Sequence, residues 1–322
     1  MSRLGYHLPN FTYPGSDPAR VFEIVVAQAT EAESSGFDRL TLMDHFYQLP
    51  QLGRHDEPMM ECYTMLGALA QRTNTTQLSA MVTGNTYRNP MLLAKEVTTL
   101  DHVSGGRATL GIGAGWYQLE HDAFGIEFGT FTDRFEKLEE ALQIIVPMLR
   151  GEPVSFAGKH YQATDAVNSP APLSSIPIMI GGSGEKKTLR MVAQYADESN
   201  FVGIRTTAEV MHKLDVLAGH CETLNRDRSE ITVTVTLGCC IAPTMEQAVD
   251  DLRVMGHAKG WNDEVINMAR SSLVFGDPDT VGEQLASFAE TGIDGLGLSL
   301  AANGHIPGRL TLLGEIATKA LS

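Results

Sequence analysis

Two residues that can transfer protons, Asp44 and His45, directly follow a short apolar stretch in TLMDHFYQLP (41–50). A carboxylate beside an imidazole can raise the pKa of that imidazole and suit it to proton transfer near neutral pH. The plain alternative is a strand that leaves the core, so that its last residues meet water. The choice between the two depends on the elements that surround this pair.

A glycine-rich turn occurs in IMIGGSGEKKTLRMV (178–192), between an apolar run and the start of a helical pattern. Glycine lets the backbone approach a ligand closely, and free N–H groups at a helix N-terminus favour a phosphate. The turn is not a P-loop, because Glu185 follows Gly184 and the Gly-Lys-Ser/Thr sequence is missing. A plain tight turn needs fewer glycines, so we predict a phosphate site here.

A second run of small residues, GIGAGW (111–116), resembles a dinucleotide-binding loop only in part. The third glycine of G-x-G-x-x-G is absent, so that motif is not met. Gly113 to Gly115 would instead let a flat ligand lie against the end of a strand. Gly111 could equally be a small residue that packs inside the fold.

Other charged residues fit structural roles better than catalytic ones. Arg88, in AMVTGNTYRNP (80–90), could pair with a ligand anion, but such an arginine more commonly braces a neighbouring carboxylate. Glu57 and Glu61 are spaced i, i+4 ahead of an apolar helix, and no histidine completes a metal site with them. We interpret them as acidic residues near a helix N-terminus.

Composition excludes several classes of function. The 322-residue chain has a formal net charge of −15 and a pI near 5.0, which disfavours a nucleic-acid groove or an anionic membrane surface. We expect no signal peptide and no membrane span. The four cysteines lack C-x-x-C spacing, so packed, reduced thiols in a cytoplasmic protein are expected, with no metal site.

Signatures of catalysis by side chains alone are also missing. The sequence has no G-x-S-x-G, no H-E-x-x-H and no redox cysteine pair. A phosphate corner, small residues at a strand end and one well-placed histidine favour a bound organic cofactor over hydrolysis.

Apolar β-branched runs alternate with helical patterns along the chain. In SSGFDRLTL (34–42) and ETGIDGLGL (290–298), a helix end is followed by Gly, an apolar residue, Asp and a strand, as in the αβ loops of parallel sheets. Strands separated by helices, with no clear linker, predict a (β/α)8 TIM barrel. The strands are expected at 4–8, 39–44, 78–83, 108–113, 176–181, 199–203, 231–242 and 295–300.

One domain over residues 1–322 accommodates this pattern, with surplus length in two loop excursions, 151–175 and 256–276. In such barrels the chemistry lies at the carboxyl ends of the strands. This rule favours an active-site role for His45 over simple exposure to water. It brings together Asn10, Asp44, His45, Thr83–Asn85, Ala114–Trp116 and Gly181–Gly184.

The motifs resemble the luciferase-like flavin and deazaflavin (F420) oxidoreductases, most closely the actinobacterial F420-dependent branch. NTYRNP together with SGGR and G-x-G-A-G-W is a specific combination. A further segment, GDPDTVGEQLASFAETGIDGLGL, is similar to the end of the family's sequences. The other similar segments, in family order, are GYHLPNF, SGFDRLTLMDHF, TGNTYRNPMLLAKEVTTLDHVSGGRATLGIGAGW, FTDRFEKLEEALQI and IPIMIGGSGEKKTLRMVAQYAD.

The resemblance implies a barrel that holds F420, or FMN as the alternative, with the ring across the barrel mouth. Asp44 and His45 would lie beside the reactive side of the ring. A non-prolyl cis peptide would lie behind it, at Ala80–Met81. The remaining cofactor-binding residues would be Thr83 near that peptide, Gly113, Ala114 and Gly115 beside the ring, and Gly181, Gly182, Ser183, Gly184 and Glu185 at the phosphate.

One position departs from the family pattern. Sugar-phosphate dehydrogenases of this family carry a glutamate soon after the G-x-G, where this chain has Trp116. The departure removes the proposed carboxylic acid and suggests a more apolar substrate pocket. We therefore expect His45, Asp44 and Trp116 to form the catalytic set.

Three functions stay open. The first is hydride transfer between C5 of F420 and a small organic substrate, by an enzyme that forms a homodimer. The second is an FMNH2-dependent monooxygenase with the same fold. The third is a barrel that binds a flavin without turnover, since no obvious proton donor replaces the missing acid.

Overall fold

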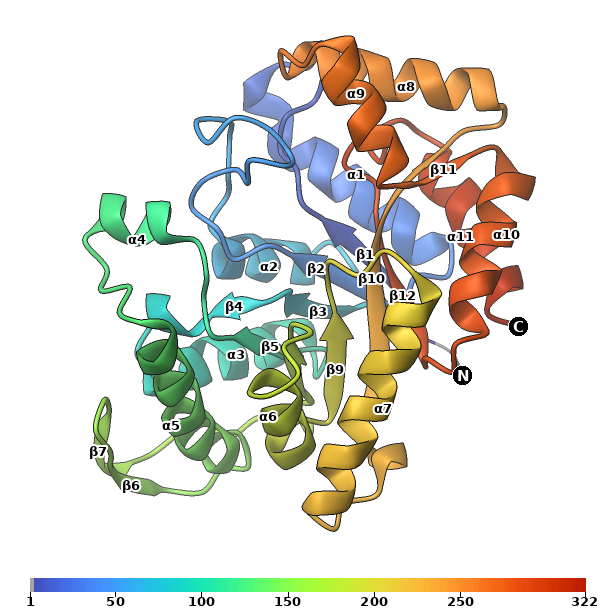
Figure 1. The fold of residues 1–322 in the computed structure, drawn as a ribbon. Helices are drawn as coiled ribbons and strands as arrows, with labels where there is room; N and C mark the ends of the chain where they lie inside the picture. Colours follow the sequence, from blue (N-terminus) through green and yellow to red (C-terminus); the bar gives the residue numbers. More distant parts are fainter. Residues whose placement is uncertain (1–2) are drawn as a thin grey trace.

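Parallel strands form a barrel that helices surround (Figure 1). The computed structural model describes residues 3–322. The strands pair in the order β3-β2-β1-β12-β10-β9-β8-β5-β4, and a parallel bridge between Leu78 and Ala108 brings the two ends of this row together. The predicted TIM barrel is therefore confirmed. Its strands are β1 (Arg3–Leu8), β2 (Arg39–Leu42), β3 (Gln77–Ala80), β4 (Thr83–Gly84), β5 (Leu110–Gly113), β8 (Ile178–Gly181), β9 (Glu198–Phe201), β10 (Thr232–Ile241) and β12 (Gly295–Ser299).

Helices cover the outside of the barrel with their apolar faces. In α1, Val21, Val25 and Ala32 recur at helical spacing and are buried, and Gly36 follows the helix with a φ of +88°. No helix among residues 3–322 has the length and apolar character needed to cross a lipid bilayer. The helices are α1 (Val21–Ser34), α2 (Cys62–Ala70), α3 (Pro90–Ser104), α4 (Gln118–Phe124), α5 (Phe131–Leu149), α6 (Thr188–Tyr195), α7 (Thr207–Thr223), α8 (Met245–Ala258), α9 (Asp263–Ser271), α10 (Pro278–Ala289) and α11 (Arg309–Ala320).

The two predicted excursions differ in character. Within 151–175, β6 (Val154–Ala157) and β7 (Gln162–Ala166) form an antiparallel hairpin. The prediction that 256–276 is irregular is wrong, because this stretch contains α9 and β11 (Val274–Gly276), which pairs in parallel with β10. The apolar run of β11 is only three residues long, which is too short for periodicity to reveal.

A second, smaller core lies beside the main one, at the carboxyl-terminal part of β10. Cys239 belongs to the main core, whereas the next residue, Cys240, packs with Leu252, Ile266 and Phe275. Successive side chains of a strand point to opposite faces, so β10 is buried on both sides. All four cysteines are free and buried, as expected from the sequence.

The interior of the barrel is polar and closely packed. Asn200 Nδ2 donates to Thr234 Oγ1 at 2.9 Å, and Thr236 Oγ1 donates to Asn200 Oδ1 at 3.0 Å. A Cβ added at Gly111 would lie 2.0 Å from the carbonyl oxygen of Ala80. The interpretation of Gly111 as a small residue packed inside the fold is therefore confirmed.

We expect Gly111→Ala to lower the free energy of unfolding by about 1–3 kcal/mol, because the new methyl group overpacks a rigid backbone contact. Gly67→Ala is the matched control, since a Cβ at Gly67 inside α2 would meet no atom within 4 Å. That change should raise stability by about 0.5–1 kcal/mol through helix propensity. Urea denaturation measures both, and a fully stable Gly111→Ala variant would contradict this packing.

Candidate active site

The carboxyl ends of the barrel strands gather the predicted site residues on one side of the molecule. The barrel ladders are parallel, so the segments after β2, β4, β5 and β8 leave from the same end. His45 follows β2, Trp116 follows β5 and Gly182 follows β8. In Figure 1 the loop after β2 and helix α4, which follows β5, lie toward the upper left of the barrel as drawn. The imidazole and the glycine turn therefore share one mouth.

A buried carboxylate, Glu120 in the first turn of α4, holds His45 in place. Its Oε2 accepts a hydrogen bond from His45 Nδ1 at 2.9 Å and another from the hydroxyl of Tyr87. Its Oε1 accepts from the backbone N–H of Phe46 at 2.6 Å and of Tyr47 at 2.8 Å. Burial raises the pKa of Glu120, but the hydrogen bonds from His45, Tyr87 and Tyr47 outweigh it, and the pKa lies below its usual value. The group is therefore a carboxylate at neutral pH.

This contact determines which nitrogen of His45 can react. An ionised carboxylate only accepts hydrogen bonds, so His45 Nδ1 must carry a proton. Within residues 3–322, His45 Nε2 has no hydrogen-bond partner. Glu120 thus leaves Nε2 as the nitrogen that can bind or release a proton at the mouth.

The prediction that Asp44 is the acidic partner of His45 is wrong. Successive residues after β2 point in different directions. The Asp44 carboxylate accepts hydrogen bonds from Arg88 at 2.7 and 3.0 Å and from the N–H of Gly84 at 3.1 Å. Burial raises the pKa of Asp44, and the Arg88 guanidinium opposes that effect. Asp44 therefore fixes the loop after β4 rather than tuning the imidazole.

Arg88 has the structural role that its sequence context indicates. Besides Asp44, it pairs with Glu61 at 2.7 Å and Glu96 at 3.0 Å, and it lies 4.9 Å from the ring centre of Tyr63. Glu61 also caps the N-terminus of α2, as expected from the sequence. The guanidinium is therefore fully engaged in protein contacts.

Aromatic side chains form one wall of the mouth around His45. The ring of Trp116 stacks on Tyr117 with centroids 5.2 Å apart, and both rings meet His45 edge-on at 5.8 and 5.9 Å. The structure thus brings Trp116 and His45 together, and 55% of Trp116 is exposed. Phe46 extends the wall by packing against Phe124 at 4.6 Å.

The glycines at the ends of β5 and β8 make room for Val82. A Cβ at Gly113 would lie 2.9 Å from Val82 Cγ2, and one at Gly181 would lie 2.6 Å from Val82 Cγ1. Val82, Gly113 and Gly181 form a surface of small groups at the strand ends, which we call the shelf. The absence of a side chain at both glycines therefore makes room for Val82, whereas the sequence suggested that it makes room for a ligand.

The non-prolyl cis peptide joins Met81 to Val82, one residue later than the expected Ala80–Met81 bond. The ladder of β3 ends at Ala80 and β4 begins at Thr83, so the cis bond falls in the link between them. Ala80 is buried in β3, and the hydroxyl of Thr83 is 2.6 Å from that of Tyr63. Neither Ala80 nor Thr83 thus has its side chain free at the mouth.

Two more of the predicted cofactor residues begin the loop after β5. Ala114 is half-buried against the main core. Gly115 has a φ of +76°, and a Cβ there would lie 2.7 Å from Thr86 Oγ1. Arg134 Nε donates to the carbonyl oxygen of Gly115 at 3.1 Å. These contacts fix the point from which Trp116 projects.

The glycine turn after β8 presents unpaired backbone donors. Gly182 has a φ of +115° and donates its N–H to the carbonyl oxygen of Asn200 at 3.0 Å. From Ser183 to Lys186, no backbone N–H has an acceptor within residues 3–322. The Glu185 carboxylate points away and pairs with Lys213 at 2.5 Å, so only its N–H could serve a phosphate. A row of free N–H groups ahead of α6 fits a phosphate.

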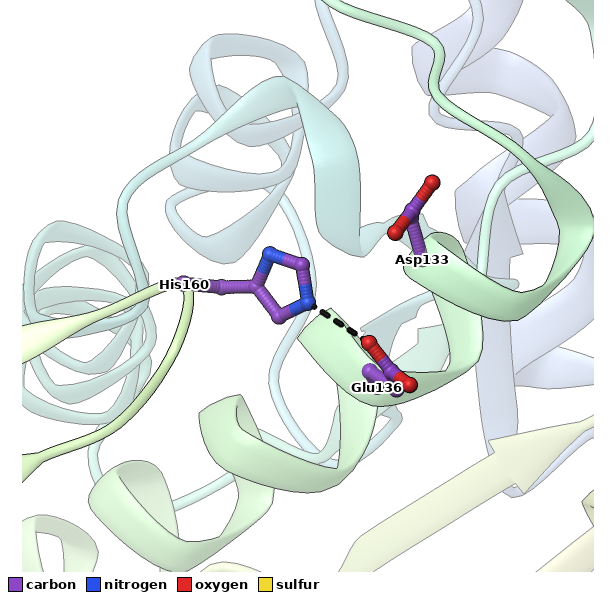
Figure 2. A group of neighbouring side chains, drawn as sticks. All are labelled: Asp133, Glu136 and His160. Carbon is purple, nitrogen blue, oxygen red and sulfur yellow. Dashed lines mark hydrogen bonds and ion pairs between the residues drawn. The ribbon is translucent and has the colours of Figure 1, made fainter.

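Another cluster, Asp133, Glu136 and His160, lies where α5 meets the β6–β7 hairpin. Figure 2 shows the His160 ring directed at Glu136, with Nε2 3.0 Å from Oε2. The ligand atoms of the three residues lie within 4.8 Å of one another. The Lys159 ammonium already pairs with both carboxylates, at 2.8 Å from Glu136 and 3.6 Å from Asp133. The cluster is best described as an ion-pair network that holds the hairpin.

Sequence reasoning missed Glu120, the residue that orients His45. The available signal was its position, four residues after Trp116 in the segment that leaves the fourth predicted strand, 108–113. A carboxyl group is therefore present close to Trp116, where no obvious proton donor was expected from the sequence. Glu120 acts as an anchor, however, because its ionised carboxylate cannot donate a proton.

The fold and this mouth define a family. Residues 2–295 match the model of the luciferase-like monooxygenases, and the chain belongs to that family. It is 26% identical over 316 residues to an F420-dependent glucose-6-phosphate dehydrogenase of Segniliparus rotundus, with 87% of each chain covered. It is 27% identical over 301 residues to a 5,10-methylenetetrahydromethanopterin reductase of Archaeoglobus fulgidus, with 81% of this chain and 85% of that one covered.

Solved structures share the fold. An F420-dependent secondary alcohol dehydrogenase in complex with an F420–acetone adduct superimposes with a TM-score of 0.81 at 20% identity, covering 100% of this chain and 99% of that one. The oxygenating constituent of 3,6-diketocamphane monooxygenase from Pseudomonas putida, in complex with FMN, gives a TM-score of 0.76 at 19% identity. This second alignment covers 99% of this chain and 98% of the monooxygenase chain.

We expect Glu120→Gln to lower the free energy of unfolding at pH 7 by roughly 1–3 kcal/mol, because buried donors lose their acceptor. The folded-state pKa of Glu120 is depressed, so its contribution is present above the ordinary value of 4.5 and is lost as the pH falls through the folded value. The difference from wild type should therefore shrink on acidification below that value.

Glu127→Gln is the matched control for this measurement. Glu127 pairs with Lys137 at 2.8 Å, but its side chain is 81% exposed, so the change should have little effect on stability. Urea denaturation at several pH values tests both variants. Equal stabilities for the two variants at pH 7 would refute the anchoring role of Glu120.

Proposed function

We propose that this protein is an F420-dependent oxidoreductase that transfers a hydride between C5 of the deazaflavin and a small organic substrate. The observation that carries the proposal is the free Nε2 of His45, which Glu120 fixes at the same barrel end as the free N–H groups of the glycine turn. Relatives named as F420-dependent glucose-6-phosphate dehydrogenases match across more than four-fifths of the chain, which supports the choice of cofactor.

The described residues fit such a cofactor. The N–H groups from Ser183 to Lys186 would hold its phosphate, and the shelf of Val82, Gly113 and Gly181 would support its ring. A bound deazaflavin supplies a carbon that gives or takes a hydride, a reaction that side chains alone do not perform.

His45 would handle the proton that accompanies the hydride. Its Nε2 would give a proton to the substrate oxygen or take one from it, while Glu120 keeps Nδ1 protonated and the ring oriented. Trp116 and Tyr117 lie against the imidazole and would exclude water from one side of it. A dry, oriented base favours a single direction of approach for the substrate.

The mouth favours an uncharged, apolar or conjugated substrate. Arg88 is committed to Asp44, Glu61 and Glu96. Lys259 Nζ is equally committed, because it pairs with Glu57 at 2.9 Å and its side chain is 1% exposed. With these cations engaged and an aromatic wall beside His45, we do not extend the glucose-6-phosphate activity of the relatives to this chain.

A second candidate is an FMNH2-dependent monooxygenase. It is supported by the description of the family model and by the FMN-bound monooxygenase with the same fold. The same shelf, glycine turn and His45 would serve FMN, so the two candidates share the site and differ in cofactor and reaction.

Titration of the purified protein with F420 and, separately, with FMN tests the proposal. The protein should be made in a host without F420, and fluorescence quenching gives both dissociation constants. We expect tight F420 binding and at least tenfold weaker FMN binding. Tight FMN binding with no response to F420 would transfer the proposal to the monooxygenase.

We expect His45→Ala to reduce kcat by roughly 10²- to 10⁴-fold, the usual contribution of an acid–base residue. Turnover is followed as the change in deazaflavin absorbance with a panel of secondary alcohols and α,β-unsaturated ketones. His102→Ala, which changes a half-buried histidine on α3 whose Nε2 lies 2.8 Å from the carbonyl oxygen of Ala171, should retain wild-type kcat.

The F420 dissociation constant of the His45→Ala variant should stay within about twofold of wild type. Turnover within a few-fold of wild type would show that His45 does not transfer the proton. Complete inactivity of the wild type on every compound would instead favour a barrel that binds its cofactor without turnover.

A further inference from the structure

A second imidazole, His7 on β1, faces the barrel axis near His45. Its neighbour Tyr6 points outward, where its hydroxyl donates to Gln28 of α1 at 2.7 Å, so His7 points inward. His7 pairs in register with Thr41 on β2 and Ser299 on β12. It therefore belongs to the last inward-facing layer of side chains before the mouth.

The contacts of His7 leave one ring nitrogen unused. Nδ1 is 2.9 Å from Thr41 Oγ1, and the residue is only 7% exposed. Within residues 3–322, Nε2 has no hydrogen-bond partner. This nitrogen is not completely enclosed by protein atoms. A ring nitrogen that is nearly buried and unpaired gains free energy when a ligand supplies its hydrogen bond.

His7 is a neutral group at neutral pH. Burial, and then the electrostatic effect of His45, lower the pKa of His7 from 6.5 to about 4. At neutral pH, His7 is therefore a hydrogen-bonding group that does not exchange protons with a substrate. Depending on its tautomer, Nε2 either accepts or donates one hydrogen bond.

We propose that His7 Nε2 binds the polar edge of the cofactor ring. The inference rests on the proposed function and names a binding residue that the sequence did not single out. Flavins and deazaflavins carry a pyrimidinedione edge, in which an N–H lies between two carbonyl groups, so this edge matches either tautomer. A side chain with one free nitrogen and no charge suits such a neutral edge.

The level of His7 in the barrel favours the cofactor over the substrate as its partner. His7 lies within β1, at the strand ends, as do Gly113 and Gly181 of the shelf. The aromatic wall comes instead from Trp116 and Tyr117, in the loop beyond β5. A ring supported by the shelf is therefore at the level of His7, and a substrate against the aromatic wall is farther out.

Equilibrium binding of F420 to the purified apoprotein tests the inference without any need for turnover. We expect His7→Leu to weaken F420 binding at least tenfold and His7→Gln, which keeps a donor and an acceptor, to weaken it less than threefold. His305→Leu is the control, since His305 is also a partly buried imidazole with a lowered pKa but packs on Tyr13 with ring centres 5.3 Å apart. It should bind F420 like wild type.

The outcomes separate this inference from the proposed function. If wild type binds neither F420 nor FMN, the proposed function fails. If wild type binds F420 and folded His7→Leu binds it equally well, the inference about His7 is wrong. If only the KM of the organic substrate rises in His7→Leu, His7 serves the substrate, and the inference is again wrong. Far-UV circular dichroism and thermal unfolding establish that each variant is folded.

Discussion

The mouth of this barrel depends on the hydrogen bonds that the carboxylate of Glu120 accepts. This carboxylate is buried, and it accepts hydrogen bonds from His45, Tyr87 and the backbone of Phe46 and Tyr47. Those donors come from the loop after β2 and the segment after β4, whereas Glu120 itself follows β5. One charge thus holds three separate connections together, and the orientation of the His45 imidazole depends on that junction.

The sheet could be predicted because its signals are local. Apolar β-branched runs, glycine at the helix ends and the length of the chain suffice to indicate parallel strands with helices between them. The expected strands are present, and the third is divided into β3 and β4. The short strand β11 was not predicted, because three residues are too few to show a hydrophobic period. Tertiary pairing with β10, which no local pattern encodes, makes it a strand.

The site was harder to predict because its partners are distant in sequence. Adjacency suggested Asp44 as the partner of His45, but neighbouring residues after a strand point in different directions. Asp44 therefore meets Arg88, and His45 meets Glu120, 75 residues farther along the chain. The family pattern drew attention to Trp116, so the carboxyl group one helical turn beyond it was overlooked. Strand-end position identified the right region, and only coordinates could pair the side chains within it.

The ion pair of Lys259 has a consequence for how the protein can be divided. Its ammonium comes from the end of α8 and contacts Asn10 at 3.2 Å, Leu52 at 2.5 Å and Glu57 at 2.9 Å. Those partners belong to the loops after β1 and β2, and the second of these loops begins next to His45. An N-terminal fragment that stops short of α8 would retain the residues at the mouth yet lose this distant tether. The loop after β2 is in this sense completed by a part of the chain that is synthesised much later.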